Sequence, residues 1–332
     1  MTATRTADLR ARLKSLSRLS LADLPTPLLE LPRLSEHLGG PRLLVKREDQ
    51  TGMAFGGNKV REFEYSVAPA VDEGYDVLLH GAASQSNQSR VTAATAARLG
   101  LKAVMVGRQD AHAEPVNGNL LLTTLFGAEV HLVQSGEERQ RVIEQLEAAG
   151  HKVYDTSSDG YYLRSVAYVD GCLELQDQLL ERDLRADGIY LASGMHTHCG
   201  LSVGAAALGM DARIVGISMS PQDDTVEQGR LAATANHVAE LLDLDLNFGP
   251  EDFETYGAYA GQAYGVPTSA GLEALRLAAR YEALVLDPVY TSKAFAGMID
   301  HIRQGQWNKD QTLVFVHTGG TPGLFAYAQE VL

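Results

Sequence analysis

A lysine stands directly after a glycine-rich turn, a combination that can support covalent chemistry. In the segment 51–65, TGMAFGGNKVREFEY, Gly56 and Gly57 predict a tight turn, and the residues after Asn58 predict the first turns of a helix. Lys59 therefore falls at or near a helix N-terminus, where the helix dipole disfavours a charged amine by ~0.3–1 kcal/mol. A neutral amine is a nucleophile that condenses with aldehydes. By position alone, a solvated lysine without a chemical role is the more common case.

Polar side chains open the next predicted helix. The segment 78–94 runs from an apolar strand through a loop of small residues into Ser86, Asn87 and Gln88. Ser86 and Asn87 are good N-cap residues, so capping by itself accounts for them. The functional alternative is that the three side chains, with the free N–H groups of the helix terminus, bind a carboxylate. Asn87 is also able to donate to a phenolate-type oxygen.

A third turn, between a predicted strand and a helix rich in Gly and Ala, suits a phosphate group. Its residues are Ser193, Gly194, Met195, His196, Thr197, His198, Cys199 and Gly200. Backbone N–H groups of such a loop bind phosphate together with the helix N-terminus, although the lysine of a Walker loop and the GxGxxG spacing are absent. His196, His198 and Cys199 are metal-ligating types. Their spacing is too close for a four-ligand site and no second cluster partners them, so we predict no metal.

Two hydroxyl groups follow later predicted strands. Thr318 comes directly after the apolar run 312–317, ahead of Pro322 at a helix start, and Tyr290 follows a strand expected to end at Asp287-Pro288. A plain capped turn and amphipathic packing of the tyrosine are the simpler alternatives. Together the turns place a lysine, a phosphate loop, a carboxylate-binding group and two hydroxyls at one sheet edge. This set predicts pyridoxal phosphate (PLP) with an amino-acid substrate.

Short apolar runs alternate with longer amphipathic segments along most of the chain. The expected strands are 76–81, 102–107, 128–133, 152–155, 188–193, 213–218, 285–288 and 312–317, and the expected helices include the N-terminal segment, 86–100, 136–150, roughly 160–183 and 270–284. Apolar strands separated by helices predict an α/β fold with mainly parallel, doubly wound sheets, whose ligands bind beyond the carboxyl ends of the strands. No low-complexity linker divides the chain, so we expect two domains to be interleaved.

Composition narrows the class of protein. The 332 residues are 45% hydrophobic and 21% charged, which is ordinary globular usage. A formal charge of −14 argues against a nucleic-acid partner, because nucleic-acid affinity depends on neutralising phosphates. Two cysteines make no disulfide framework, and no apolar run reaches the ~18 residues of a membrane span. We therefore expect a cytoplasmic enzyme without a signal peptide and without a membrane partner.

The motifs GGNK, QSNQ, DPVYTSK and HTGG, together with the N-terminal stretch LPTPLLELPRLSEHLGG, resemble one known family. This family comprises the D-cysteine desulfhydrases and 1-aminocyclopropane-1-carboxylate (ACC) deaminases, which are PLP enzymes of the tryptophan synthase β-like fold, fold type II. The resemblance covers nearly the whole chain. It implies two doubly wound, mainly parallel sheets, with a large PLP-binding domain at 1–58 and 165–332 and a small inserted α/β domain at 59–164. It also implies a homodimer.

The resemblance further implies a role for each matching residue. Lys59 matches the lysine that binds the cofactor covalently, Asn87 the asparagine near its 3′ oxygen, and Thr318 the hydroxyl beside its pyridine nitrogen. The implied cofactor-binding set is Lys59, Asn87, Ser193, Gly194, Met195, His196, Thr197, Gly200 and Thr318. The implied substrate-binding set is Ser86, Asn87, Gln88, Tyr264 and Tyr290. The implied catalytic set is Lys59, Ser86 and Tyr290, with Ser86 placed to accept a proton.

Three departures from the family pattern bear on the substrate. Met195-His196 stand where the phosphate loop is usually rich in Ser and Gly, and the loop is one residue shorter. Thr291 follows Tyr290 where ACC deaminases have glutamate. Gln88, by contrast, is the deaminase-like choice, since desulfhydrases more often have histidine there.

These features predict a PLP-dependent carbon–sulfur lyase. The expected reaction is α,β-elimination from D-cysteine, or a close β-substituted alanine, to pyruvate, ammonia and sulfide. The alternative is an ACC deaminase that forms 2-oxobutanoate and ammonia. A non-catalytic PLP-binding protein is a second alternative.

Overall fold

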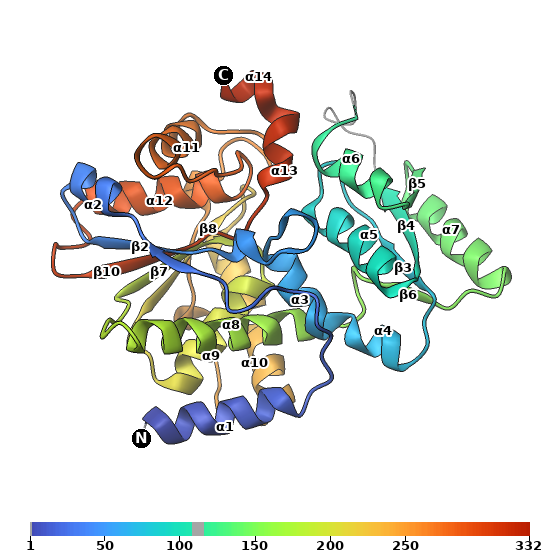
Figure 1. The fold of residues 1–332 in the computed structure, drawn as a ribbon, viewed down its shortest axis with the longest axis horizontal. Helices are drawn as coiled ribbons and strands as arrows, with labels where there is room; N and C mark the ends of the chain where they lie inside the picture. Colours follow the sequence, from blue (N-terminus) through green and yellow to red (C-terminus); the bar gives the residue numbers. More distant parts are fainter. Residues whose placement is uncertain (1, 108–115) are drawn as a thin grey trace.

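The fold contains two mainly parallel sheets, which lie side by side in Figure 1. The structure is a computed structural model and describes residues 2–107 and 116–332. The larger sheet has the order β1 (Leu28–Glu30), β2 (Arg42–Lys46), β10 (Thr312–Val316), β7 (Gly188–Ser193), β8 (Arg213–Ser218) and β9 (Glu254–Tyr256). Only the β1–β2 pair is antiparallel among these neighbours. The predicted fold class, α/β with two mainly parallel sheets, is confirmed.

Helices cover both faces of the larger sheet, and each face has its own hydrophobic core (Figure 1). One core includes α1 (Thr2–Lys14), α8 (Leu163–Leu180), α9 (His196–Leu208) and α10 (Asp224–Leu241). The other includes α2 (Pro32–Leu38), α11 (Ser269–Glu282) and α12 (Thr291–Arg303). Of the helices in the described ranges, none is long and apolar enough to cross a membrane.

The smaller sheet has the order β5 (Glu129–Leu132), β4 (Lys102–Gly107), β3 (Val77–His80) and β6 (Val153–Asp155), all parallel. Leu78 of β3 enters a core with α3 (Asn58–Ser66) and α5 (Asn87–Leu99), whereas Val77 and Leu79 enter a core with α7 (Gly136–Ala148). This alternation is the period of two that a strand imposes. The remaining helices are α4 (Ala68–Asp72), α6 (Gly118–Leu125), α13 (Thr321–Leu324) and α14 (Ala328–Val331). The domain boundaries at 58/59 and 164/165 stay a proposal.

One predicted strand is wrong. Residues 283–287 form no strand, although Leu286 is buried. The side chain of Asp287 accepts the N–H groups of Val289, Tyr290 and Thr291 at 2.8–2.9 Å, and these bonds turn the chain directly into α12. Pro288 has no N–H group to donate to a sheet. The predicted strands 102–107, 188–193 and 213–218, in contrast, are confirmed to the residue.

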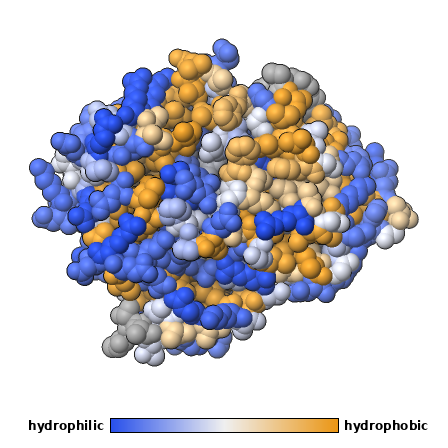
Figure 2. Space-filling model, in the orientation of Figure 1, coloured by the Kyte–Doolittle hydropathy of each residue, from blue (hydrophilic) through white to orange (hydrophobic). Residues whose placement is uncertain are grey.

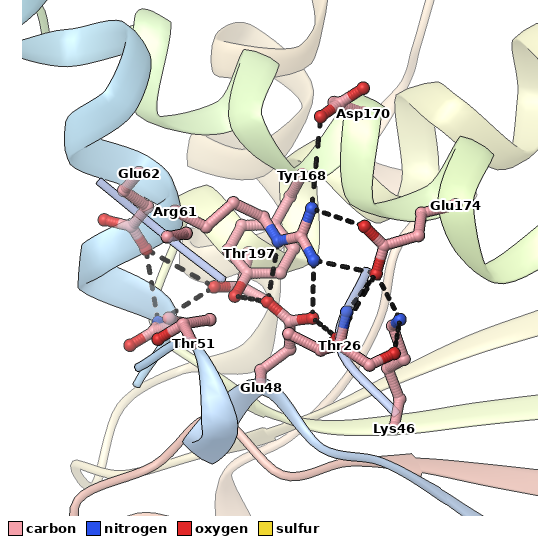
Figure 3. Close-up of polar contacts among 12 residues, drawn as sticks. Thr26, Lys46, Glu48, Thr51, Arg61, Glu62, Tyr168, Asp170, Glu174 and Thr197 are labelled. Carbon is pink, nitrogen blue, oxygen red and sulfur yellow. Dashed lines mark hydrogen bonds and ion pairs between the residues drawn. The ribbon is translucent and has the colours of Figure 1, made fainter. Parts of the chain in front are cut away.

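A buried ion network connects the larger sheet to α3 and α8 (Figure 3). Arg61 of α3 is fully buried, and its guanidinium donates to Glu48 at 2.8 and 2.9 Å and to Glu174 of α8 at 2.9 and 3.2 Å. Tyr168 donates to Glu48 at 2.9 Å, and Lys46 of β2 pairs with Glu174. Although burial alone raises it, the Arg61 guanidinium lowers the pKa of Glu48 to about 2. Glu48 therefore stays ionised near neutral pH.

Removing Arg61 should destabilise the fold strongly. In Arg61→Met the carboxylates of Glu48 and Glu174 lose their shared cation while they remain buried, and breaking such a pair costs about 3–5 kcal/mol. Urea unfolding followed by circular dichroism measures this loss. The matched control is Arg10→Met, because Arg10 and Asp177 form an exposed pair that contributes at most about 1 kcal/mol. Equal losses in the two variants would contradict the role assigned to the network.

Candidate active site

The turn that carries Lys59 is held against the end of β10 by a close approach of two backbones. Gly57 has φ 109° and Gly319 has φ 99°, and a Cβ on Gly319 would lie 2.6 Å from the Cα of Gly57. Only glycine tolerates both conditions. The N–H of Asn58 donates to the carbonyl of Thr318 at 2.9 Å, and Lys59 follows as the second residue of α3. Lys59 and Thr318 are thereby brought to the same place, as predicted.

A cavity of about 300 Å³ opens at this point. Its lining consists of Asn58, Lys59, His80, Gly81, Ala82, Ser86, Asn87, Gln88, Ala192, Gly194, Tyr290, Thr318 and Gly319. Seven of the predicted site residues therefore share one cavity: Lys59, Ser86, Asn87, Gln88, Gly194, Tyr290 and Thr318. Ser193, Met195, His196, Thr197, Gly200 and Tyr264 are not part of this lining. Their predicted roles, like those of the lining residues, stay proposals.

The predicted phosphate loop ends at the N-terminus of α9. Met195 has φ 73°, which turns the chain so that α9 begins at His196. Thr197 accepts a hydrogen bond from the side chain of Asn58 at 3.0 Å, and so the helix start is tied to the lysine-bearing turn. Gly200 lies one turn inside the helix, where a Cβ would be 2.2 Å from the carbonyl of Ser165 in α8. Gly200 thus serves helix packing, and the N–H groups before it face the cavity end of the helix.

The side chains of the loop bond to protein partners. His196 pairs with the hydroxyl of Ser165, and His198 with that of Ser193, each at 3.2 Å. Burial lowers the pKa of His198 to about 4 and raises that of Cys199 to about 12. Within the described residues no three His, Cys, Asp or Glu side chains are grouped to hold a metal ion. That the chemistry uses no metal stays a prediction.

Asn87 has its amide orientation set by a chain of hydrogen bonds. Arg90, which can only donate, donates to the side-chain oxygen of Asn119 at 2.8 Å. The amide nitrogen of Asn119 must then donate, and it does so to the side-chain oxygen of Asn87 at 2.9 Å. Since that oxygen is occupied, the NH₂ group of Asn87 is the one left for the cavity. A donor at this wall suits an anionic oxygen on a ligand.

Ser86 and Gln88 each retain a hydrogen-bond donor at the cavity wall. Ser86 accepts the N–H of Ser89 at 3.2 Å, so the predicted N-cap is confirmed, and its hydroxyl hydrogen is not used by this bond. Gln88 uses its amide nitrogen to donate to the carbonyl of Thr156 at 2.8 Å, which holds the side chain at the cavity wall. One of its two N–H groups suffices for that bond.

A second cavity of about 260 Å³ adjoins the first and shares Asn87 and Tyr290 with it. Tyr264 lines this second cavity, and its hydroxyl is hydrogen-bonded to that of Tyr290. Burial, and then the neighbouring Tyr264, raise the pKa of Tyr290 well above its usual value, so its hydroxyl keeps its proton. Thr291 lines neither cavity, because its hydroxyl donates to Asp287 at 2.6 Å.

Sequence reasoning missed three charged or titratable groups near the first cavity. Glu62 is fully buried and pairs with Lys59 at 2.9 and 3.0 Å; the three-residue spacing on a predicted helix was a signal for this pair. His80 ends β3 at the cavity wall, and burial, followed by the charge of Arg164, lowers its pKa to about 3. Arg164 itself lies near the start of α8, and no motif pointed to it.

Comparison with known proteins agrees with this geometry. Residues 19–319 match the family model described as pyridoxal-phosphate dependent enzyme. The chain belongs to this family. It is 39% identical over 324 residues to a D-cysteine desulfhydrase of Salmonella newport, a match that covers 95% of this chain and 97% of the relative. A D-cysteine desulfhydrase of Salmonella typhi shows the same identity and coverage.

Solved structures of other proteins have the same fold. A structure described as an ACC deaminase homologue has a TM-score of 0.85 at 31% identity, with 98% of each chain covered. A threonine deaminase of Solanum lycopersicum, at 16% identity and a TM-score of 0.66 over 99% of this chain, supports the fold alone. The predicted family resemblance and the predicted cofactor, pyridoxal phosphate, are therefore confirmed.

The residues present fit this cofactor. A primary amine, that of Lys59, and a neutral hydroxyl, that of Thr318, line the cavity, and α9 begins two residues after Gly194 of the same lining. In addition, two nitrogens of the buried Arg164 have no hydrogen-bond partner among the described residues, which is the state expected of a group that binds an anion. Lys59, Asn87 and Thr318 would hold the ring of the cofactor, and the start of α9 its phosphate.

Lys59 is expected to bind the cofactor covalently. Lys59→Ala should lose the visible absorbance of lysine-bound PLP and nearly all turnover, because no other amine lines the cavity among the described residues. Absorbance spectra measure lysine-bound PLP, and borohydride reduction followed by peptide mapping identifies the lysine that carries it. Lys102→Ala is the control, since Lys102 forms an exposed pair with Glu129. A labelled peptide that lacks residue 59 in the native protein would move the assignment to another lysine.

Asn119 is expected to act through Asn87. In Asn119→Asp, the new carboxylate accepts from Arg90 but has no N–H for Asn87, so Asn87 should rotate its amide and present an oxygen to the cavity. The loss of one donor to an anionic oxygen should weaken PLP binding about ten-fold. Equilibrium titration of the apoprotein measures the change, with Asn117→Asp as the matched control. An unchanged affinity in Asn119→Asp would show that the amide orientation of Asn87 is not set by this chain of bonds.

Proposed function

We propose that this protein is a D-cysteine desulfhydrase, which converts D-cysteine and water to pyruvate, ammonia and hydrogen sulfide. The observation that carries this proposal concerns carboxylates. Among the described residues that line the two cavities, the one carboxylate is that of Asp287. Both of its oxygens already accept hydrogen bonds, from Val289, Tyr290 and Thr291. The lining of the two cavities therefore offers an amine and neutral hydroxyls, and the carboxylate of Glu62, which is not part of this lining, is paired with Lys59.

An amine together with neutral hydroxyls suits β-elimination. When bound, PLP supplies an electron sink that acidifies the α-carbon of an attached amino acid. The amine of Lys59 would move the α-proton. Thr318 is neutral, so beside the pyridine nitrogen it would supply no partner anion, and the ring would then be a weaker electron sink that favours elimination. Thiolate is a good leaving group, so no strong acid is needed at the β-carbon.

The remaining side chains hold the substrate. Ser86, Gln88 and the N-terminus of α5 bind its carboxylate with neutral donors. Tyr290, which keeps its proton, donates from the side of the second cavity, and Tyr264 fixes its hydroxyl there. Ser86 lines the same cavity as Lys59 and would relay a proton there. Relatives at 39% identity along nearly the whole chain carry the name D-cysteine desulfhydrase, which supports this substrate.

ACC deamination is the alternative, and the solved ACC deaminase homologue and Gln88 favour it. ACC has no α-proton, so opening its ring requires a nucleophile or an acid–base group at a ring carbon. The side chain that follows Tyr290 is Thr291, whose hydroxyl is committed to Asp287. We therefore rank ACC second and a non-catalytic PLP-binding role third.

We further propose a cytoplasmic homodimer. Leu125 of α6 and Phe325 are 72% and 66% exposed, and Figure 2 shows apolar side chains gathered in the upper right of the visible face, over α6. An apolar patch of this kind is typical of a surface that pairs with another chain. The acidic charge of the chain argues against a nucleic-acid partner.

The choice of substrate is tested by kinetics. We expect kcat/KM for D-cysteine to exceed that for ACC by about 100-fold or more, since general acid–base catalysis that ACC would lack contributes about that factor. Pyruvate and 2-oxobutanoate assays on D-cysteine, L-cysteine, D-serine and ACC make the comparison. Tyr290→Phe should lower both rates, whereas Tyr162→Phe, a partly exposed control, should not. Equal or better turnover of ACC would replace this proposal with the deaminase.

A further inference from the structure

The side chain of Arg164 is an unexplained buried cation. Arg164 is only 4% exposed, and its Nε and Nη2 atoms have no hydrogen-bond partner in the described part of the chain. An arginine keeps its charge in a protein, so it does not escape this situation by losing a proton. A buried guanidinium with unpaired donors costs several kcal/mol unless an anion satisfies it. The protein is therefore expected to present Arg164 to a ligand.

Arg164 lies near the start of α9, where the predicted phosphate loop ends. Its guanidinium carbon is 6.0 Å from the ring centre of Tyr161, and that ring packs edge-on against His196, the first residue of α9, at 4.4 Å. The next residue in the chain, Ser165, pairs with the same His196 at 3.2 Å. After burial, the charge of Arg164 is the largest influence that lowers the pKa of both His80 and His196. These two residues border the cavity wall and the loop, respectively.

The charge balance of this region requires a cation other than Lys59. Glu62 is fully buried and contacts three groups: the amide of Asn58 at 3.2 Å, the amine of Lys59 and the hydroxyl of Thr197 at 3.5 Å. Figure 3 shows Glu62 next to Thr197, at the start of α9. A phosphate bound here adds negative charge next to that carboxylate, while Lys59 is occupied by the cofactor. Arg164 is a buried cation of this region, and its Nε and Nη2 donors have no partner among the described residues.

We infer that Arg164 binds the phosphate of the cofactor through its Nε and Nη2 atoms and offsets the negative charge of Glu62. These two nitrogens form one edge of the guanidinium plane, and that edge pairs with two oxygens of a phosphate at once. The start of α9 supplies backbone N–H groups to the same phosphate. This inference deepens the proposed phosphate-loop assignment and rests on it. It explains how a loop that holds two neutral histidines and faces a buried carboxylate still favours a dianion.

The test separates the phosphate from the rest of the cofactor. Apoproteins of the native chain and of Arg164→Met are titrated with PLP and with pyridoxal, which lacks only the phosphate, and absorbance or tyrosine fluorescence reports binding. Arg164→Met should weaken PLP about ten- to hundred-fold, the range for hydrogen bonds to a charged group, and pyridoxal less than about three-fold. Arg164→Lys should recover part of the PLP affinity. Arg98→Met, on α5, is the matched control and should change neither ligand.

A second variant, Glu62→Gln, should change the ratio of PLP affinity to pyridoxal affinity in the opposite direction. Glu62→Gln removes the buried negative charge, so it should raise the ratio of PLP affinity to pyridoxal affinity; because both ligands need Lys59, any effect on the lysine cancels in the ratio. The ³¹P resonance of bound PLP should also differ between the native protein and Arg164→Lys. An equal loss of PLP and pyridoxal affinity in Arg164→Met, or an unchanged PLP affinity in Arg164→Lys and Arg164→Met, would overturn the inference.

These readouts do not depend on turnover. If D-cysteine proves not to be the substrate, the ratio of PLP to pyridoxal affinity still reports on Arg164. If Arg164→Met does not fold, Arg164→Lys and Glu62→Gln carry the test by themselves, since the first keeps the charge and the second keeps the shape. A ratio that stays constant across those two variants overturns the inference as well.

Discussion

The buried contact between Arg61 and the carboxylates of Glu48 and Glu174 is the constraint on which the site depends. Arg61 stands two residues after Lys59 on α3, so the ion network fixes the helix that presents the amine. Glu48 follows β2 and Glu174 belongs to α8, and the guanidinium thus joins one strand and two helices of different parts of the chain. Because every charged group in the network has a partner, the network holds this arrangement without leaving an isolated charge.

A close contact between two backbone segments, in addition to the ion network, fixes the position of Lys59. Gly57 and Gly319 let the turn before Lys59 lie directly on the chain that leaves β10, and Asn58 donates to Thr318 across this contact. Asn58 also donates to Thr197, so one residue connects the lysine turn, the end of β10 and the start of α9. Three segments far apart in the sequence thereby share one cavity, and their geometry does not depend on long flexible side chains.

The cavity is notable for how few charges it contains. Burial keeps the pKa of His80 and His196 well below neutrality, and Tyr290 keeps its proton. Asp287 is a capping group whose oxygens are filled by the turn into α12. Most of the electrostatic character of the site then depends on three groups: the amine of Lys59, the carboxylate of Glu62 and the guanidinium of Arg164. An aldehyde and a phosphate on one ligand would complement the amine of Lys59 and the guanidinium of Arg164.

The sequence alone was enough for the fold class, for most strands and for the turns that contribute to the site, because these features depend on local patterns. Apolar runs such as 188–193 and 213–218 form strands, and Gly-Gly-Asn before Lys59 forms a turn, whatever surrounds them. The failed strand at 285–288 was overridden by a single side chain, Asp287, whose bonds to the following N–H groups have no signature in periodicity.

Only the tertiary structure decided the charges and orientations inside the site. Arg164 is more than a hundred residues from Lys59 in the chain, and its proposed role rests on two buried nitrogens that lack partners among the described residues, a property that no motif encodes. The amide of Asn87 is oriented by Asn119 and Arg90, contacts that form only after α5 and α6 have packed together. Such properties arise from burial and from partners distant in the sequence, and so they exist only once the chain has folded.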